Sequence, residues 1–392
     1  MSNQIKNKFN SIRSVLIRVD FNVPIINNKI SDFSRVEAVI PTIRFFLKLN
    51  KKVVLISHLG RPKSFDKKFS LQKIIKPLSK MLGKQVEFKK KWLTDTNFNK
   101  NSLAEVSLLE NLRFHSEETS NEKEFAKIIS RYGDIYVNDA FAVSHRHHAS
   151  VSAILEFFKD KYMGFLLKKE LSHLQSLTKI KKRPFTLIVG GSKIGTKIHI
   201  LKSFLGIADN ILIGGGMSFP FIKNKGGDIG QSICIDDELT IVSDFLKTAK
   251  DFNTKIILPT DTFAVEKIDK VDSIKLLDIC KVPKNFMGVD IGKESINKFK
   301  EIILSSNSIL WNGPMGIAEI SEYSNGTRKV AQYISQATEN NTYTMIGGGD
   351  TVSDISRFGL KDKFSYVSTG GGAMLEFFKK NKLETTSELK DL

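Results

Sequence analysis

Short apolar runs that end in polar or glycine-rich clusters recur along the whole chain. In the first half four such runs are expected to be buried strands, at residues 15–19, 53–56, 106–109 and 135–137. Five more follow at residues 186–189, 211–213, 309–311, 343–346 and 366–367. Apolar residues at helical spacing separate several of them, and the clearest such stripe is Val36, Val39, Ile40, Ile43 and Phe46. Alternating strands and helices predict an α/β protein with parallel sheets.

The join between the halves is predicted to be one long helix over residues 162–179. Leu166, Leu167, Leu171, Leu174 and Leu177 recur there at helical spacing. A helix in this place connects two domains and is a candidate hinge.

Arginines concentrate near the strand ends of the first half. In an open parallel sheet, ligands bind just beyond the carboxyl ends of the strands, where these side chains would converge. Guanidinium groups bind carboxylate or phosphate through two parallel hydrogen bonds, so the cluster predicts a small polyanion as ligand. Eight of the 11 arginines lie in the first 150 residues: Arg13, Arg18, Arg35, Arg44, Arg61, Arg113, Arg131 and Arg146.

Arg35 is expected in the first turn of the helix that opens at Asp32. A cation there is disfavoured by the helix dipole, which suggests an anion shared with the helix end, although a plain surface arginine fits as well. Arg13, Arg44 and Arg131 fit exposed surfaces. The nearby His145, His147 and His148 lack an acidic partner at metal-ligand spacing, so a metal cluster is disfavoured.

The glycine-rich stretch TYTMIGGGDTVSD, residues 342–354, turns from a strand into a helix. Backbone N–H groups in such a turn, together with the helix dipole, favour a phosphate. Asp350 would repel the phosphate unless a cation lay between them, which suggests Mg²⁺. The alternative is a glycine cap followed by an Asp cap. Glycine clusters after several other strands favour the phosphate interpretation.

The segment GGSKIGTK, residues 190–197, comes close to a nucleotide-binding P-loop but lacks its Lys-Ser or Lys-Thr ending. We expect Lys193 and Lys197, four residues apart, to share one helix face and hold phosphates. No glycine cluster matches GxGxxG with a correctly placed acid, so a dinucleotide fold has weak support. Neither half shows a general base, which a kinase with a carboxylate acceptor would not need.

Length and composition fit a soluble protein of two nearly equal domains. The 392 residues are 41% hydrophobic and 26% charged, with no apolar run of about 20 residues and no signal peptide, so we expect a cytoplasmic protein. Cys234 and Cys280 are expected to be buried thiols. The net charge of +18 comes mainly from scattered lysines, which indicates a solvated surface rather than nucleic-acid binding.

Ten motifs in order make the sequence resemble the phosphoglycerate kinases. They are RVDFNVP (18–24), SHLGRP (57–62), ENLRF (110–114), NDAF with HR (138–146), GGSK…K (190–197), IGGGM (213–217), MGVDIG (287–292), WNGPMG…E (311–319), GGGDT (347–351) and STGGGA (368–373). The resemblance implies two Rossmann-like three-layer domains with parallel sheets that face each other across a hinged cleft. It also implies reversible, Mg²⁺-dependent phosphoryl transfer between 1,3-bisphosphoglycerate and ADP, which gives 3-phosphoglycerate and ATP.

The resemblance assigns roles to residues of both halves. The first domain, residues 1–165, would bind the glycerate through Asp20, Asn22, Arg35, His58, Leu59, Gly60, Arg61, Arg113 and Arg146. The second, residues 181–384, would bind the nucleotide through Gly191, Lys193, Lys197, Gly215, Asn312, Glu319, Gly347, Gly348, Gly349, Asp350 and Thr351. Arg35, Lys193, Gly349 and Gly371 would act on the transferred group, and Asp350 would bind Mg²⁺. Residues 166–180 would link the domains, and residues 385–392 would pack back on the first.

Ala142, Val143, Gly195 and Thr196 depart from the common family pattern without removing a charged ligand. The resemblance leaves the basic net charge unexplained. We expect a monomer with small-molecule ligands and neither a membrane nor a nucleic-acid partner. A two-domain dehydrogenase and a basic RNA-associated protein remain the rival hypotheses.

Overall fold

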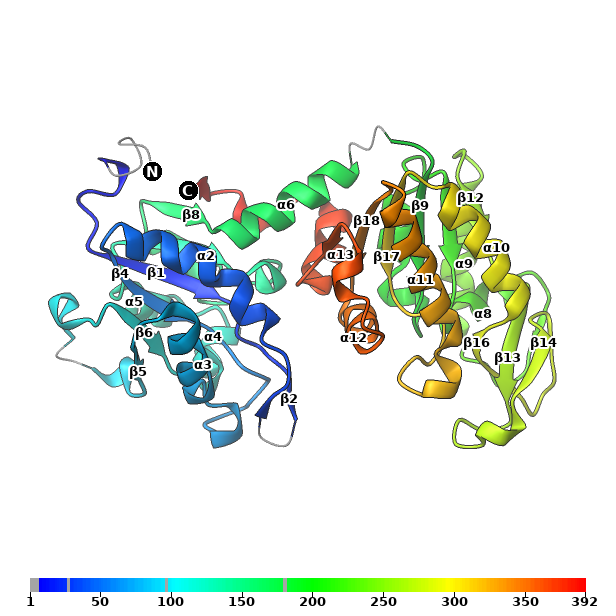
Figure 1. The fold of residues 1–392 in the computed structure, drawn as a ribbon, viewed down its shortest axis with the longest axis horizontal. Coiled ribbons are helices and arrows are strands. Elements are labelled where there is room, and N and C mark those ends of the chain that lie inside the picture. Colours follow the sequence, from blue (N-terminus) through cyan, green and yellow to red (C-terminus); the bar gives the residue numbers. More distant parts are fainter. Residues whose placement is uncertain (1–6, 27–28, 96–97, 179–181) are drawn as a thin grey trace. The chain divides into compact units, whose positions relative to one another are not determined.

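The computed structural model describes residues 7–26, 29–95, 98–178 and 182–392 (Figure 1). The chain divides into two compact units, unit 1 (Met1–Ser172 with Lys382–Leu392) and unit 2 (His173–Asn381). The division falls inside helix α6 (Phe165–Thr178), the helix expected between the halves. Its predicted residues 179 and 180 lie outside the described part of the chain.

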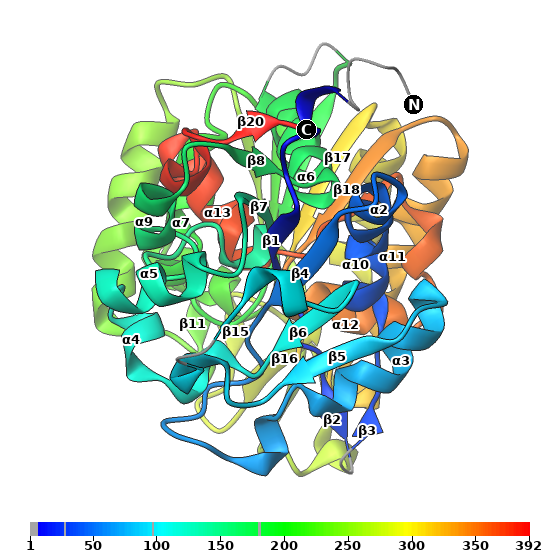
Figure 2. The ribbon, with the colours of Figure 1, turned by 90° about the vertical axis from the view of Figure 1, so that its left-hand side faces the viewer.

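Unit 1 is built on a parallel sheet of seven strands in the order β20-β8-β7-β1-β4-β6-β5 (Figure 2). The strands of unit 1, with the small β2–β3 hairpin, are β1 (Ser14–Val19), β2 (Ile25–Ile26), β3 (Lys29–Ile30), β4 (Lys52–Ile56), β5 (Val86–Lys89), β6 (Val106–Leu109), β7 (Ile135–Asp139), β8 (Lys161–Met163) and β20 (Lys390–Asp391). Its helices besides α6 are α2 (Ser34–Lys48), α3 (Gln72–Leu82), α4 (Ser116–Thr119) and α5 (Lys123–Ser130).

Both faces of this sheet are covered. On one face Ile17, Leu55 and Val137 join a core cluster that includes the apolar stripes of α2 and α3. Neighbouring residues along the strands, such as Leu16 and Tyr136, point to the opposite face and are also fully buried. Strands buried on two sides are typical of a three-layer α/β domain.

Unit 2 contains a second parallel sheet, in the order β12-β10-β9-β17-β18-β19. In chain order this is 3-2-1-4-5-6, the arrangement of dinucleotide-binding folds, although no GxGxxG motif announced it. The unit's strands are β9 (Phe185–Val189), β10 (Asn210–Ile213), β11 (Asp228–Ile229), β12 (Lys255–Ile257), β13 (Asp261–Val265), β14 (Lys275–Asp278), β15 (Lys281–Val282), β16 (Met287–Ile291), β17 (Ser308–Asn312), β18 (Tyr343–Gly347) and β19 (Tyr366–Val367). Its helices are α7 (Ile198–Ser203), α8 (Phe219–Asn224), α9 (Asp236–Ala249), α10 (Lys293–Ser305), α11 (Asn325–Glu339), α12 (Gly349–Arg357) and α13 (Gly371–Lys380).

Helices cover both faces of the second sheet as well. On one face Ile188 and Trp311 pack in a cluster with residues of α10, α11 and α12. On the other, Phe185 stacks edge-on against Phe204, whose ring contacts Phe378 of α13. An antiparallel sheet, β14-β13-β16, is added beside this domain and was not predicted. The α/β fold with two parallel sheets is confirmed.

Three local predictions were wrong. Tyr162, expected at the start of the long helix, belongs to β8, and the helix begins at Phe165. Lys193 and Lys197 do not share a helix face, because Lys193 is extended and a 3₁₀ turn at Ile194–Thr196 separates them. Cys280 is an exposed free thiol and Cys234 is only half-buried.

Candidate functional site

The residues of unit 1 that were predicted to bind a polyanion follow the carboxyl ends of β1, β4, β6 and β7. These strands are adjacent and parallel, so their ends meet at one edge of the sheet. Hydrogen bonds tie the loops together, since Gly60 N donates to Asn22 Oδ1 at 2.8 Å and Arg113 Nη1 donates to Gly60 O at 2.7 Å. Leu59 N donates to Asn111 Oδ1 at 3.2 Å. The expected convergence of these loops is therefore present.

Three arginines surround a cavity of about 200 Å³ in this cluster. Its lining is Arg61, Pro62, Arg113, Thr119, Arg146 and His148. Burial, together with the nearby charges of Arg146 and Arg18, lowers the pKa of the Arg113 guanidinium to about 10. Arg113 Nε is buried and has no hydrogen-bond partner among the residues described. A bound anion would offset the repulsion between these guanidinium groups and would accept a hydrogen bond from the unused donor.

Arg35 and Asp20 form an ion pair at the edge of this cluster. Arg35 lies in the first turn of α2, as predicted, and its Nη1 is 2.6 Å from Asp20 Oδ2. Asp20 Oδ1 also accepts a hydrogen bond from Asn22 N at 3.0 Å. A carboxylate held in this way is an acceptor for an alcohol hydroxyl, while Arg35 remains a donor to an anion.

His58 is almost completely buried, with 1% of its surface exposed. Burial lowers its pKa well below the usual value, and the positive charges of Arg18, Arg113, Arg146 and Arg35 add to that shift. The imidazole is therefore neutral over the physiological range and acts by hydrogen bonding.

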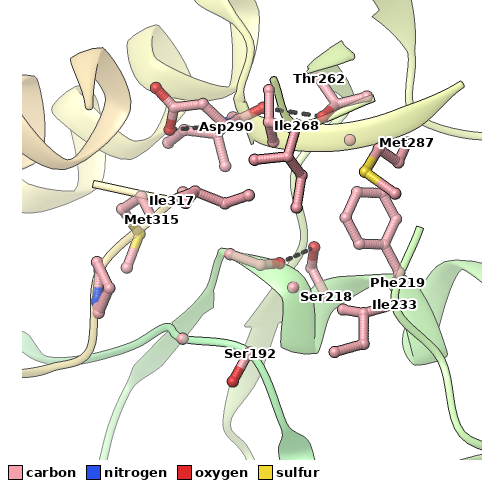
Figure 3. Close-up of a pocket in the computed structure, with 18 of the residues that line it drawn as sticks. Ser192, Ser218, Phe219, Ile233, Thr262, Ile268, Met287, Asp290, Met315 and Ile317 are labelled. Carbon is pink, nitrogen blue, oxygen red and sulfur yellow. Dashed lines mark hydrogen bonds between the residues drawn. The ribbon is translucent and has the colours of Figure 1, made fainter. Parts of the chain in front are cut away.

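Unit 2 holds a separate cavity of about 460 Å³ beyond the carboxyl ends of β9, β10 and β17 (Figure 3). Among the described residues that line it, Gly191, Gly215, Glu319 and Asp350 were predicted to bind nucleotide. Its other walls are largely apolar and come in part from the antiparallel sheet: Phe219, Ile233, Ile268, Met287, Val289 and Ile317. Its size and its apolar lining with a few polar groups suit an aromatic ligand.

Glycine is required where the turns of this cavity touch. Gly215 has φ +65°, and a Cβ there would lie 2.8 Å from both Gly191 N and Pro314 O. Any side chain at this position would push the turns after β9, β10 and β17 apart, so the backbone itself forms the cavity wall.

A cluster of donors adjoins the cavity. Lys197 Nζ donates to Gly190 O at 2.6 Å and to Asn312 O at 3.3 Å. Burial lowers the pKa of Lys197 to about 8, and the carboxylate of Asp350 partly opposes this shift. The buried Nδ2 of Asn312 has no partner among the residues described. An ammonium group and an unused amide donor so close together favour an anionic ligand.

The N-termini of α12 and α13 meet beside these donors. A Cβ on Gly371 would lie 2.7 Å from Gly348 Cα and 3.3 Å from Gly349 N. Gly347 ends β18, and Thr351 is buried, with its Oγ1 accepting a hydrogen bond from Gly313 N at 2.7 Å. Two adjacent helix starts concentrate positive potential and free N–H groups, which suits phosphate oxygens.

Lys193 is not on the helix face that the sequence predicted for it. It is exposed, it precedes the 3₁₀ turn, and it is absent from the lining of the 460 Å³ cavity. Its neighbour Ser192 does line the cavity, so Lys193 lies next to the other predicted residues rather than among those that form the wall.

Comparison with known proteins decides which chemistry these two sites serve. The sequence model described as phosphoglycerate kinase matches residues 6–381. The chain is 40% identical over 382 residues to the phosphoglycerate kinase of Dictyoglomus turgidum, covering 97% of this chain and 96% of that protein. It is also 40% identical to the protein named phosphoglycerate kinase 3, cytosolic, of Arabidopsis thaliana, covering 94% and 92%. The chain belongs to the phosphoglycerate kinase family.

Solved structures agree with this assignment. The phosphoglycerate kinase of Coxiella burnetii superposes with a TM-score of 0.83 at 35% identity, over 95% of each chain. The protein is therefore a kinase of glycolysis that uses a nucleotide, and its reaction is the family's phosphoryl transfer between 1,3-bisphosphoglycerate and ADP. The dehydrogenase hypothesis was wrong.

The sequence reasoning missed two sets of residues at these sites: the buried partners of His58 in unit 1 and part of the cavity wall in unit 2. Arg18 is fully buried and hydrogen-bonds to Ser150 and His58, and Ser150 in turn donates to Glu118. Arg18 had only been counted with the converging arginines, and Glu118 and Ser150 had no assigned role. A charged residue inside the apolar run VLIRV was the available signal, because a buried arginine needs partners. The apolar cavity wall at β16 and the neighbouring Thr262 of β13 were also missed, although MGVDIG had been noted as a motif.

Proposed function

We propose that unit 1 binds the glycerate substrates and that unit 2 binds ADP or ATP. One contrast carries this proposal: three arginines line the cavity of unit 1, whereas glycine turns and apolar side chains line the larger cavity of unit 2. A compact, multiply charged substrate fits the arginines. A nucleotide needs an apolar space for its base and backbone amides for its phosphates.

In unit 1 the arginine cavity holds the phosphate of 3-phosphoglycerate or 1,3-bisphosphoglycerate. Arg61, Arg113 and Arg146 supply the guanidinium forks. Asp20, Asn22 and His58, with the backbone of Leu59 and Gly60, orient the glycerate by hydrogen bonds. Arg35, at the outer edge, donates to the group that is transferred. The family assigns these roles to matching positions, and the loop contacts described above support them.

In unit 2 the base occupies the apolar cavity. Glu319 at its rim accepts hydrogen bonds from the ribose hydroxyls, and Gly191 and Gly215 let the backbone approach the ligand. Lys197, Asn312 and Gly347 to Thr351 hold the phosphates. The N–H groups of Gly349 and Gly371 stabilise the transferring phosphoryl group, and the exposed Lys193 follows that group during transfer.

Mg²⁺ fits this arrangement as a companion of the nucleotide. Among the described residues no group of three or more His, Cys, Asp or Glu side chains could hold a metal ion by itself. Asp350, in the first turn of α12 and at the cavity, offers one exposed carboxylate. One carboxylate with phosphate oxygens is a usual Mg²⁺ ligand set. When bound, the ion neutralises phosphate charge during transfer.

The acceptor carboxylate of 3-phosphoglycerate is already ionised, so no general base is required. Catalysis consists of holding two anions together while Arg35, Lys193 and the helix-end amides offset the repulsion between them. Because the ligands bind different units, the units must approach each other during the reaction by hinge bending, which also excludes water from the acyl phosphate.

The protein acts as a cytoplasmic monomer on small molecules, without a nucleic-acid or membrane partner. No helix in the described ranges is long and apolar enough to cross a membrane.

A coupled assay with 3-phosphoglycerate, ATP and Mg²⁺ tests the proposal. We expect turnover that depends on all three, with 3-phosphoglycerate as the acceptor. Turnover that persists without 3-phosphoglycerate would contradict it.

Replacement of Asp350 by Asn tests the metal role. We expect the Mg²⁺ concentration for half-maximal rate to rise about tenfold, because one charged ligand is lost. Glu376→Gln is the control, since Glu376 pairs with Lys380 on α13. An unchanged Mg²⁺ requirement in Asp350→Asn would remove Asp350 from the metal site.

A further inference from the structure

A chain of buried hydrogen bonds leads from Glu118 to His58 in unit 1. Ser150 Oγ donates to Glu118 Oε1 at 2.7 Å, and Ser150 N donates to Glu118 Oε2 at 2.9 Å. Arg18 Nε donates to Ser150 Oγ at 2.9 Å. Arg18 Nη2 then lies 3.1 Å from His58 Nδ1. All four residues are at most 1% exposed.

The direction of each bond in this chain is fixed by chemistry. A buried carboxylate only accepts, so the single hydroxyl hydrogen of Ser150 is directed at Glu118. The hydroxyl oxygen is then left as an acceptor for Arg18. An arginine can only donate, and therefore His58 Nδ1 must be the acceptor of the last bond.

These hydrogen bonds allow only one of the three protonation states of the His58 ring. The doubly protonated ring is excluded because burial and the surrounding arginines lower the pKa of His58 well below its usual value. The tautomer protonated at Nδ1 would set an N–H against the donor of Arg18. Asp20 Oδ1 lies 4.0 Å from Nδ1, beyond hydrogen-bond distance. The remaining state carries its hydrogen on Nε2.

We propose that Glu118 is a positioning residue that, through Ser150 and Arg18, holds His58 in the tautomer with N–H at Nε2. Nε2 has no hydrogen-bond partner within the described part of unit 1. It is therefore the ring atom available to donate to a glycerate oxygen. This last step rests on the proposed binding of the glycerate by unit 1.

Glu118 also supplies the charge that keeps Arg18 in place. A buried guanidinium without a counter-charge would be costly. Burial raises the pKa of the Glu118 carboxyl, whereas the charge of Arg18 and the hydrogen bonds from Ser150 oppose this shift and favour the ionised form. Arg18 Nη1 donates to Val19 O as well, so the guanidinium is held on three sides. Loss of Glu118 would release the group that orients His58.

Nitrogen NMR of the full-length enzyme labelled with ¹⁵N-histidine tests the tautomer directly. The His58 signals are identified by their loss in His58→Gln. We expect Nδ1 to resonate as an unprotonated ring nitrogen and Nε2 as a protonated one. The reverse assignment, or averaged signals for the two nitrogens, would overturn the proposal.

Glu118→Gln tests whether Glu118 determines the tautomer of His58 through Ser150 and Arg18. Glu117→Gln is the matched control, because it removes a neighbouring carboxylate of α4 that takes no part in the hydrogen bonds between Glu118 and His58. In Glu118→Gln we expect His58 to become a mixture of tautomers. The KM for 3-phosphoglycerate should rise about tenfold, the scale of one charge-assisted hydrogen bond, with the KM for MgATP unchanged. A folded Glu118→Gln enzyme whose His58 spectrum matches the control would overturn the proposal.

Variants at Ser150 provide a second test in case Glu118→Gln does not fold. Ser150→Ala removes the linking hydroxyl and should mix the His58 tautomers, whereas Ser150→Thr retains the hydroxyl and should preserve the native spectrum. A single His58 tautomer in Ser150→Ala would contradict the proposed role of the hydrogen bonds through Ser150. If the tautomers mix but the KM for 3-phosphoglycerate stays constant, Glu118 positions His58, and the proposed contact of His58 with the glycerate is wrong.

Discussion

The anion sites proposed for the two units are built from different parts of the chain. Unit 1 uses side chains: Arg61, Arg113 and Arg146 carry the charge, and loops from four strand ends hold them. Unit 2 uses mainly backbone, with glycine turns and two helix starts, and adds Lys197 and an apolar cavity. A small, permanently charged substrate is bound mainly by charged side chains, whereas a nucleotide also needs a cavity that fits its base. Charge changes should therefore affect mainly unit 1, and changes at glycine should affect mainly unit 2.

The largest expected effect comes from Arg35→Ala in unit 1. We predict that kcat falls about 100-fold or more, the scale of losing one donor to the transition state. Arg44→Ala is the matched control, because Arg44 lies on the same helix and donates only to Met81 O among the described residues. Steady-state kinetics measures both, and a near-normal kcat in Arg35→Ala would remove Arg35 from the transferring group.

A change at Gly348 tests the backbone site of unit 2. Gly348 has φ +94°, and a Cβ there would lie 3.1 Å from Asn312 Nδ2. We predict that Gly348→Ala raises the KM for MgATP about tenfold, because strain of about 1 to 3 kcal/mol distorts the phosphate turn. The KM for 3-phosphoglycerate should stay constant.

Gly359→Ala is the control for Gly348→Ala. Gly359 also has a positive φ of +71°, but a Cβ there meets no atom within 4 Å. It should cost stability without a change in either KM. Equal kinetic effects of the two substitutions would show that general strain, rather than the phosphate turn, is responsible.

The smallest effect is a pH dependence in unit 2. Burial lowers the pKa of Lys197 to about 8, so its ammonium form is present below that pH and is lost above it. We predict that kcat/KM for MgATP falls about fivefold between pH 7 and 9.5 in the native enzyme, because the neutral amine loses its charge but can still donate a hydrogen bond to a phosphate oxygen. Lys197→Arg, which stays charged, should abolish this decline. The same decline in Lys197→Arg would assign it to another group.

Nine of the parallel strands were predicted because each is a short apolar run with a distinct polar or glycine-rich end, whereas β5, β8, β12 and β20 were missed. Arg35 in the first turn of α2 was also correct, since one helical stripe fixed the start of that helix. The start of α6 was missed because its cap comes from a distant residue. Asp139 Oδ1 accepts hydrogen bonds from Leu166 N at 2.8 Å and Leu167 N at 3.1 Å.

The residues that line the two cavities were predictable where a single residue type dominates. The arginines of unit 1 and the glycine turns of unit 2 could be identified from their places after strands. The antiparallel sheet that walls the cavity was not, because strands such as β14 are short and largely exposed and lack a clear alternation. The Arg18 environment was missed because its partners, Glu118 and Ser150, are remote in sequence.

Calorimetric titration of 3-phosphoglycerate and MgADP into two variants tests the division of ligands most directly. For Arg61→Ala we predict that the Kd of 3-phosphoglycerate rises at least about tenfold while the Kd of MgADP stays within about twofold. Gly348→Ala should give the opposite pattern. If each variant weakens both ligands to the same extent, the assignment of the glycerate to unit 1 and the nucleotide to unit 2 is wrong.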